Sequence, residues 1–160
     1  MKLCIPTFFA CLAFTTSASA ATSPLPAQIL CTPDEYHRAG IEKLDLPGPA
    51  AHLLEYGGKV TITQEGHRTH YSYGKGQNFY HVKEKTAYSK DFVNIQHDVF
   101  LYSDPGWADS SGILILRADS GSGFFHIDWA KQSYYGYTHE LGAIHSFAGS
   151  CTVLKKGGAL

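Results

Sequence analysis

The chain has 160 residues, with 13 Lys and Arg residues against 14 Asp and Glu residues, and 44% of its residues are hydrophobic. This length predicts one ordinary domain, and the near-zero net charge gives no electrostatic basis for binding nucleic acid or an anionic membrane surface. Ten tyrosines, sixteen glycines and a single methionine, the initiator, favour strands and turns over helices.

Residues 1–20 have the pattern of a cleavable export signal. Lys2 supplies a positive start, a mostly apolar run follows as far as Phe14, and the small residues Ala18 and Ala20 fit the cleavage pattern. The apolar run is too short to cross a bilayer core of roughly 30 Å, and no later segment is apolar enough to do so. We therefore predict cleavage after Ala20, no membrane span in the mature chain, and a secreted or periplasmic location.

The cysteines divide between the signal and the mature chain. Cys4 and Cys11 lie inside the signal, which leaves Cys31 and Cys151 near the two ends of the mature protein. In an oxidising compartment such a pair is expected to form a disulfide, which requires Cα atoms within about 7 Å of each other. We interpret the pair as a structural clasp around the whole domain, and no cofactor is implied.

The start of the mature chain predicts a flexible leader at residues 21–30, followed by a short helix that ends near residue 40. Thr32 can cap this helix, Pro33 suits its first position, and Glu35 completes a capping box. The disulfide would then pin the helix against the last strand. Residues 50–56 are expected to form one or two further helical turns.

From residue 59 to residue 154 the sequence consists of short alternating runs punctuated by glycine-containing turns. These runs give about eight strands at regular spacing, with no alternation of strands and helices. The prediction is a mainly β fold, an antiparallel meander that forms either a barrel or a sandwich, with the short N-terminal helix in front. Residues 31–156 would be a single β-rich domain, and residues 157–160 a C-terminal tail.

Two histidines form a candidate metal or acid–base pair. If Lys75 and Gly76 make a two-residue turn, the flanking strands place His70 directly opposite His81. Directly opposed residues have Cβ atoms about 5 Å apart, close enough to share a metal ion or a proton. The alternative is a solvated polar face with two ordinary histidines.

A second candidate is His126 with Asp128, which share one face of an expected strand while Phe125 and Ile127 fill the other. A carboxylate two residues away can orient an imidazole, and the two side chains could point into a ligand cavity. The alternative is a pair of exposed polar residues on a half-buried strand.

Exposed aromatic residues are the third candidate. Trp107 lies in the long loop at residues 103–112, and Tyr134, Tyr135 and Tyr137 cluster near one hairpin. Such residues are common anchors of recognition surfaces, although they can also cap the end of a sheet.

No stretch of the sequence carries a specific catalytic motif, so an enzyme is not the favoured interpretation. We interpret the chain as an exported, disulfide-clasped β-rich binding protein that recognises a small ligand or a protein partner, including inhibitor or immunity-type roles. The alternatives are a small secreted hydrolase that uses the histidines, or a metal-binding periplasmic protein.

Overall fold

Every regular element that the computed structural model describes is a β-strand. The described residues are 25–40, 48–95, 99–102, 112–140 and 142–155. The strands are β1 Gln28–Gly40, β2 Pro49–Glu65, β3 Arg68–Tyr73, β4 Gln77–Thr86, β5 Val93–Asn94, β6 Phe100–Tyr102, β7 Ile113–Ala118, β8 Gly123–Asp128, β9 Ser133–Glu140 and β10 Ala143–Lys155.

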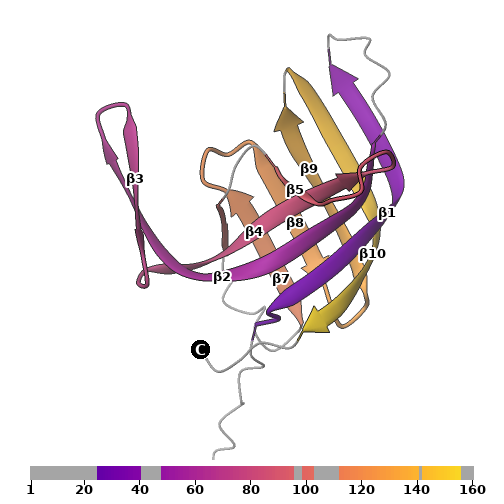
Figure 1. Cartoon of the computed structure of the whole chain (residues 1–160), viewed down its shortest axis with the longest axis horizontal. Coiled ribbons are helices and arrows are strands. Elements are labelled where there is room, and N and C mark those ends of the chain that lie inside the picture. Colours follow the sequence, from indigo (N-terminus) through magenta and orange to yellow (C-terminus); the bar gives the residue numbers. More distant parts are fainter. Residues whose placement is uncertain (1–24, 41–47, 96–98, 103–111, 141, 156–160) are drawn as a thin grey trace, which may run out of the picture.

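The ten strands form one antiparallel sheet that closes in a ring (Figure 1). Its order is β3-β2-β1-β10-β9-β8-β7-β6-β4-β5, and an additional pairing joins β2 to β4. That pairing makes a ring of eight strands, from β2 through β1 and β10 round to β4, with β3 and β5 outside it. The prediction of a mainly antiparallel β fold is confirmed, and neighbours in sequence are mostly neighbours in the sheet.

The helix predicted at residues 32–40 is wrong, because this segment belongs to β1. β1 pairs with β10 from Gln28 to Gly40, with a register shift between Pro33 and Glu35 that leaves Asp34 without a partner. Pro33 has no N–H to donate, so it is tolerated beside such an irregularity. Residues 50–56, where helical turns were expected, lie in β2.

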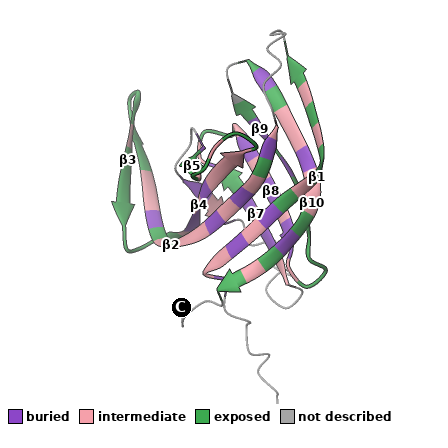
Figure 2. Cartoon of the chain, turned by 45° about the vertical axis from the view of Figure 1, so that its right-hand side comes forward, coloured by how far each residue is buried: buried purple, intermediate pink, exposed green. Residues whose placement is uncertain are grey.

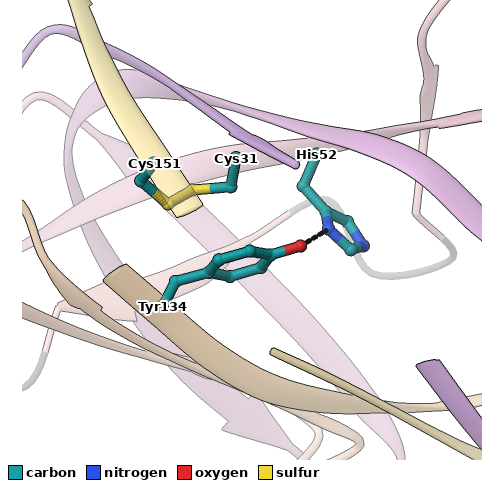
Figure 3. The surroundings of a disulfide bond; sticks show 4 residues. All are labelled: Cys31, His52, Tyr134 and Cys151. Atoms are coloured by element: carbon teal, nitrogen blue, oxygen red, sulfur yellow. Dashed lines mark hydrogen bonds between the residues drawn. A yellow bond between two sulfur atoms is a disulfide. The ribbon is translucent and has the colours of Figure 1, made fainter. Parts of the chain in front are cut away.

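The predicted disulfide is confirmed, but it joins two strands and not a helix and a strand. Cys31 of β1 lies directly opposite Cys151 of β10, with 4.1 Å between their Cα atoms and a sequence separation of 120. Both cysteines are buried in the interior of the ring (Figure 3). The bond therefore fixes the pairing of the first described strand with the last.

Side chains from all eight strands of the ring fill its interior as one hydrophobic cluster. Buried residues alternate with more exposed ones along the strands, as the twofold periodicity of a strand requires (Figure 2). The largest of the fully buried hydrophobic residues in the cluster are Tyr80, Phe100, Phe125, Ile29, Leu54, Leu114, Leu116 and Ile127. Gly136 makes room for an aromatic ring, because a Cβ there would lie 2.8 Å from the ring of Phe147.

β2 is the first half of a long bent hairpin that leaves the ring. It pairs with β4 from Pro49 to Val60 and with β3 from Val60 to Glu65, so that Val60 lies opposite both Tyr73 and Gln77. β3 and β4 therefore follow one another along the same side of β2, separated by a bulge. The bulge needs Gly74 and Gly76, whose φ angles are 95° and 98°.

Beyond the bulge, residues 60–73 project from the ring as an arm (Figure 1). A second, smaller core holds the base of this arm: Val60, Phe79 and Val99 are buried together, and Ile62 and Leu101 pack against them. Phe79 lies next to Tyr80, which points into the ring, so this small core sits on the outer surface.

A polar link ties three strands together where the ring closes. The Lys83 Nζ of β4 lies 2.5 Å from Oε2 of Glu55 in β2, and Gln28 Nε2 of β1 donates to Glu55 Oε1 at 3.0 Å. The Lys83 hydrogen bond is the main reason that the pKa of Glu55 lies below its ordinary value of 4.5, although partial burial opposes the shift.

Replacing both cysteines, Cys31→Ala with Cys151→Ala, should weaken the fold without abolishing it. Opening a cross-link over 120 residues removes on the order of 4–5 kcal/mol in the chain-entropy treatment, and measured losses are often smaller. Urea unfolding followed by circular dichroism measures the change, and the far-ultraviolet spectrum should stay that of a β protein. An unchanged unfolding midpoint would contradict a stabilising role for the bond.

Glu55 should make the free energy of unfolding depend on pH in the acidic range. Its folded pKa is depressed, so its contribution is fully present above the unfolded pKa of about 4.5 and is lost as the pH falls through the folded value. Because Glu55 is partly exposed, we expect a loss within about 1 kcal/mol. The control is Glu55→Gln, in which this part of the pH dependence should be missing from urea unfolding curves. An identical pH dependence in the variant would exclude Glu55 as its source.

Candidate functional site

A row of four side chains crosses the inner face of the sheet on four adjacent strands. Glu84 of β4 is opposite His52 of β2, His52 is opposite Cys31 of β1, and Cys31 is opposite Cys151 of β10. Directly opposite residues in a sheet share a face, so the disulfide and this histidine are lateral neighbours.

His52 is completely buried among aromatic rings. Its ring centroid lies 4.4 Å from that of Phe147 and 5.3 Å from that of Phe125. Its Nδ1 is 3.2 Å from the Tyr134 hydroxyl, as Figure 3 shows, and its Nε2 is 3.7 Å from Oε2 of Glu84. The Nε2 atom has no hydrogen-bond partner among the described residues.

Tyr134 stays protonated in this environment. Burial raises the pKa of its phenol well above the ordinary value, and the carboxylates of Asp34 and Glu84 add to the shift. Because the phenol keeps its proton, we assign its O–H as the donor to Nδ1 of His52. The Nε2 atom then faces Glu84 at 3.7 Å, beyond hydrogen-bond distance.

A carboxylate, an imidazole and a phenol in this order are groups that enzymes use for proton transfer. Here, however, the imidazole has no exposed surface, and it is enclosed by Phe125, Tyr134 and Phe147. A general base must reach the proton that it removes, so the observed geometry gives His52 a role in the packing of the interior.

The outer face of β8 and β9 carries an aromatic strip, formed by Phe124, His126, Tyr135 and Tyr137. Phe124 is opposite Tyr137 and His126 is opposite Tyr135. The His126 and Tyr135 rings are stacked with centroids 4.7 Å apart, and the Phe124 and Tyr137 rings are stacked at 6.1 Å. Tyr135 is 52% exposed and Tyr137 is 40% exposed, so the strip is open to solvent.

One end of the aromatic strip opens into a pocket of about 530 Å³ on the outer surface. Its lining combines a cation, a carboxylate and two aromatic rings, contributed by Arg117, Ala118, Asp119, Gly121, Gly123, Phe124 and Tyr137. The arm reaches this place, because the Tyr71 hydroxyl donates to Oδ2 of Asp119 at 2.5 Å.

The candidates from the tyrosine cluster separate onto two faces. Tyr135 and Tyr137 join His126 on the outer strip, whereas Tyr134 points inward and bonds to His52. Trp107 lies outside the described residues.

Among the described residues, Asp128 contacts Lys131 and not His126. Its carboxylate accepts the Lys131 backbone N–H at 2.9 Å and pairs with Lys131 Nζ at 2.9 Å. Burial opposes ionisation, but these contacts from Lys131 hold the pKa of Asp128 below its ordinary value. The carboxylate therefore closes the turn after β8.

The expected pairing of His70 with His81 is wrong. β3 pairs with β2 and not with β4, so that His70 is opposite Thr63 and His81 is opposite Glu55. His70 lies on the exposed arm, 3.5 Å from a carboxylate oxygen of Glu65. Within the described residues, no group of three or more His, Cys, Asp or Glu side chains is arranged to hold a metal ion.

The part of the chain with described coordinates also has no helix that is long and apolar enough to cross a membrane. The chain matches no protein-family model, no curated protein and no solved structure.

Tyr134→Phe should destabilise the protein by about 1–3 kcal/mol, because it leaves Nδ1 of the buried His52 without its hydrogen bond. The matched control is Tyr135→Phe, one residue along the same strand but on the exposed face, where we expect almost no change. Urea unfolding measures both variants. Equal stability of the two would mean that the buried hydrogen bond contributes nothing.

Proposed function

We propose that this chain is an exported binding protein that recognises a protein partner through its aromatic strip. The observation that carries the proposal is the pair of exposed tyrosines, Tyr135 and Tyr137, each stacked on a neighbouring ring of the strip. Tyrosines held in this way present a large contact area and lose little conformational entropy on binding, and tyrosine is enriched among the residues that dominate binding energy.

The location of the partner follows from two features. Residues 1–20 have the pattern of an export signal, and the Cys31–Cys151 bond suits an oxidising compartment. We therefore place both proteins in the periplasm or outside the cell. An inhibitor or an immunity-type protein would fit this description.

Two alternatives have weaker support. A small ligand inside the ring would have to displace the hydrophobic cluster to which all eight ring strands contribute. A hydrolase would need at least two of His70, His81 and His126 to converge with a carboxylate, but these lie on β3, β4 and β8, and no two of these described strands are paired.

The test is a comparison of captured proteins. The mature chain, immobilised with its disulfide intact, is exposed to the exported proteins of its source organism, and bound proteins are identified by mass spectrometry. The double variant Tyr135→Ser with Tyr137→Ser should lose the partner, because removing one dominant tyrosine weakens binding by about 2 kcal/mol, or about thirtyfold.

The control variant is Tyr88→Ser, which removes a tyrosine that is 85% exposed but lies outside the aromatic strip. It should capture the same partner as the unmodified chain. A partner that the double variant retains, or the absence of any partner that depends on the two tyrosines, would overturn the proposal.

A further inference from the structure

We propose that the pocket at the end of the aromatic strip binds an acidic side chain of the protein partner, next to an apolar side chain of the same segment. This inference rests on the proposed function, because it names the chemistry of the partner at one end of that surface. It follows from the charge, the aromatic rings and the rigidity of the pocket.

Arg117 supplies the charge. It is exposed on the outer face of β7, opposite Phe124 of β8, and its side chain enters the lining of the pocket. No ion pair joins Arg117 to a carboxylate of the described residues, in contrast to Lys83 and Lys131, which are each paired. A guanidinium that forms no ion pair within the described residues is well suited to bind a carboxylate through two parallel hydrogen bonds.

Asp119 lines the same pocket, but its carboxylate does not form an ion pair with Arg117. Its Oδ2 accepts a hydrogen bond from the Tyr71 hydroxyl of the arm. Its other oxygen accepts no hydrogen bond from the described residues, so it can accept one from an N–H group of a ligand. The pocket therefore offers a cation for a carboxylate and an acceptor for a backbone amide, which is the complement of a peptide segment with an acidic residue.

The aromatic rings define the neighbouring position in that segment. Phe124 and Tyr137 are stacked on each other and both line the pocket. An apolar or aromatic side chain next to the acidic one would pack on these rings while the carboxylate reaches Arg117.

Hydrogen bonds within the protein hold the turn that forms one wall of the pocket. In the turn between β7 and β8, Gly121 N–H donates to Ala118 O at 2.9 Å, and the Ser120 and Ser122 hydroxyls lie 2.8 Å apart. The N–H of His139 in β9 donates to Ser122 O at 2.7 Å. A preformed wall reduces the entropy lost on binding, so that even a short peptide can report on the site.

The probes are two blocked dipeptides, acetyl-Phe-Asp-amide and acetyl-Phe-Asn-amide, which differ in one side chain of nearly the same shape, a carboxylate in the first and an uncharged amide in the second. Each is titrated into the full mature protein while the amide signals of Gly121, Gly123 and Phe124 are followed by NMR. We expect the Asp peptide to bind with a dissociation constant of about 1 mM. The Asn peptide should bind about tenfold more weakly, because it lacks a charge-assisted hydrogen bond.

Variants of Arg117 and Tyr137 separate the two parts of the pocket. Arg117→Gln should remove the preference for the Asp peptide, whereas Arg117→Lys should keep part of it. Tyr137→Ser should weaken both peptides equally. Added salt should reduce the preference, since the charged groups are exposed.

Equal binding of the two peptides, binding of neither, or a preference that survives Arg117→Gln would each overturn this inference. None of these results affects the capture experiment, which depends on Tyr135 and Tyr137 and on the natural partner. Conversely, a carboxylate preference that depends on Arg117 could persist if no partner were captured. Each of the two proposals can therefore be overturned without affecting the other.

Discussion

The antiparallel pairing of the first described strand with the last is the constraint on which the rest of this structure depends. β1 and β10 are paired from one end of β1 to the other, and β1 is also the only strand that connects β10 to β2. Without this pairing the sheet would be open, with two long edges and an exposed hydrophobic face. The disulfide joins the same two strands, so a covalent bond and the backbone hydrogen bonds both hold β1 against β10.

Closing the ring divides the side chains of each strand between an inner and an outer surface. The inner surface is occupied by packed aromatic and aliphatic groups, and two of its polar residues, His52 and Tyr134, are hydrogen-bonded to each other. Adjacent residues of β9 illustrate the division, because Tyr134 supports the interior while Tyr135 faces solvent. The aromatic strip, the pocket and the arm lie close together on the outer surface, which is where the proposed partner would bind.

Local patterns in the sequence predicted most of the strands but not all of their partners. The alternation around Phe125 and Ile127 was enough to place β8 and its inner face correctly. The capping signals at Thr32 and Glu35 were misleading, because a capping box describes only local hydrogen bonds, and the long partner offered by β10 outweighs them. The glycines at positions 74 and 76 were interpreted as a turn, although their positive φ angles produce a bulge within a longer hairpin.

The candidate site shows the same limit. Tyr135 and Tyr137 were candidates from the sequence as members of a tyrosine cluster, and His126 was a candidate as a neighbour of Asp128. His52 and Glu84 were missed, since they meet Tyr134 and the disulfide only through strand pairing at long range. Arg117, Asp119 and Phe124 were not candidates from the sequence, because only the meeting of the β7–β8 turn with β9 and the arm brings them together around the pocket.

The burial of the disulfide has a consequence for the order of events during the maturation of the chain. Once the ring has closed, the two sulfur atoms are sealed from solvent, since Cys31 is 0% exposed and Cys151 is 2% exposed. Thiol–disulfide exchange requires direct attack on a sulfur atom, so neither an oxidant nor a reductant can act until the ring opens. The bond must then form before or during closure, and afterwards it preserves the redox conditions under which the chain folded. The oxidation state of the two cysteines therefore reports whether the chain folded under oxidising or reducing conditions.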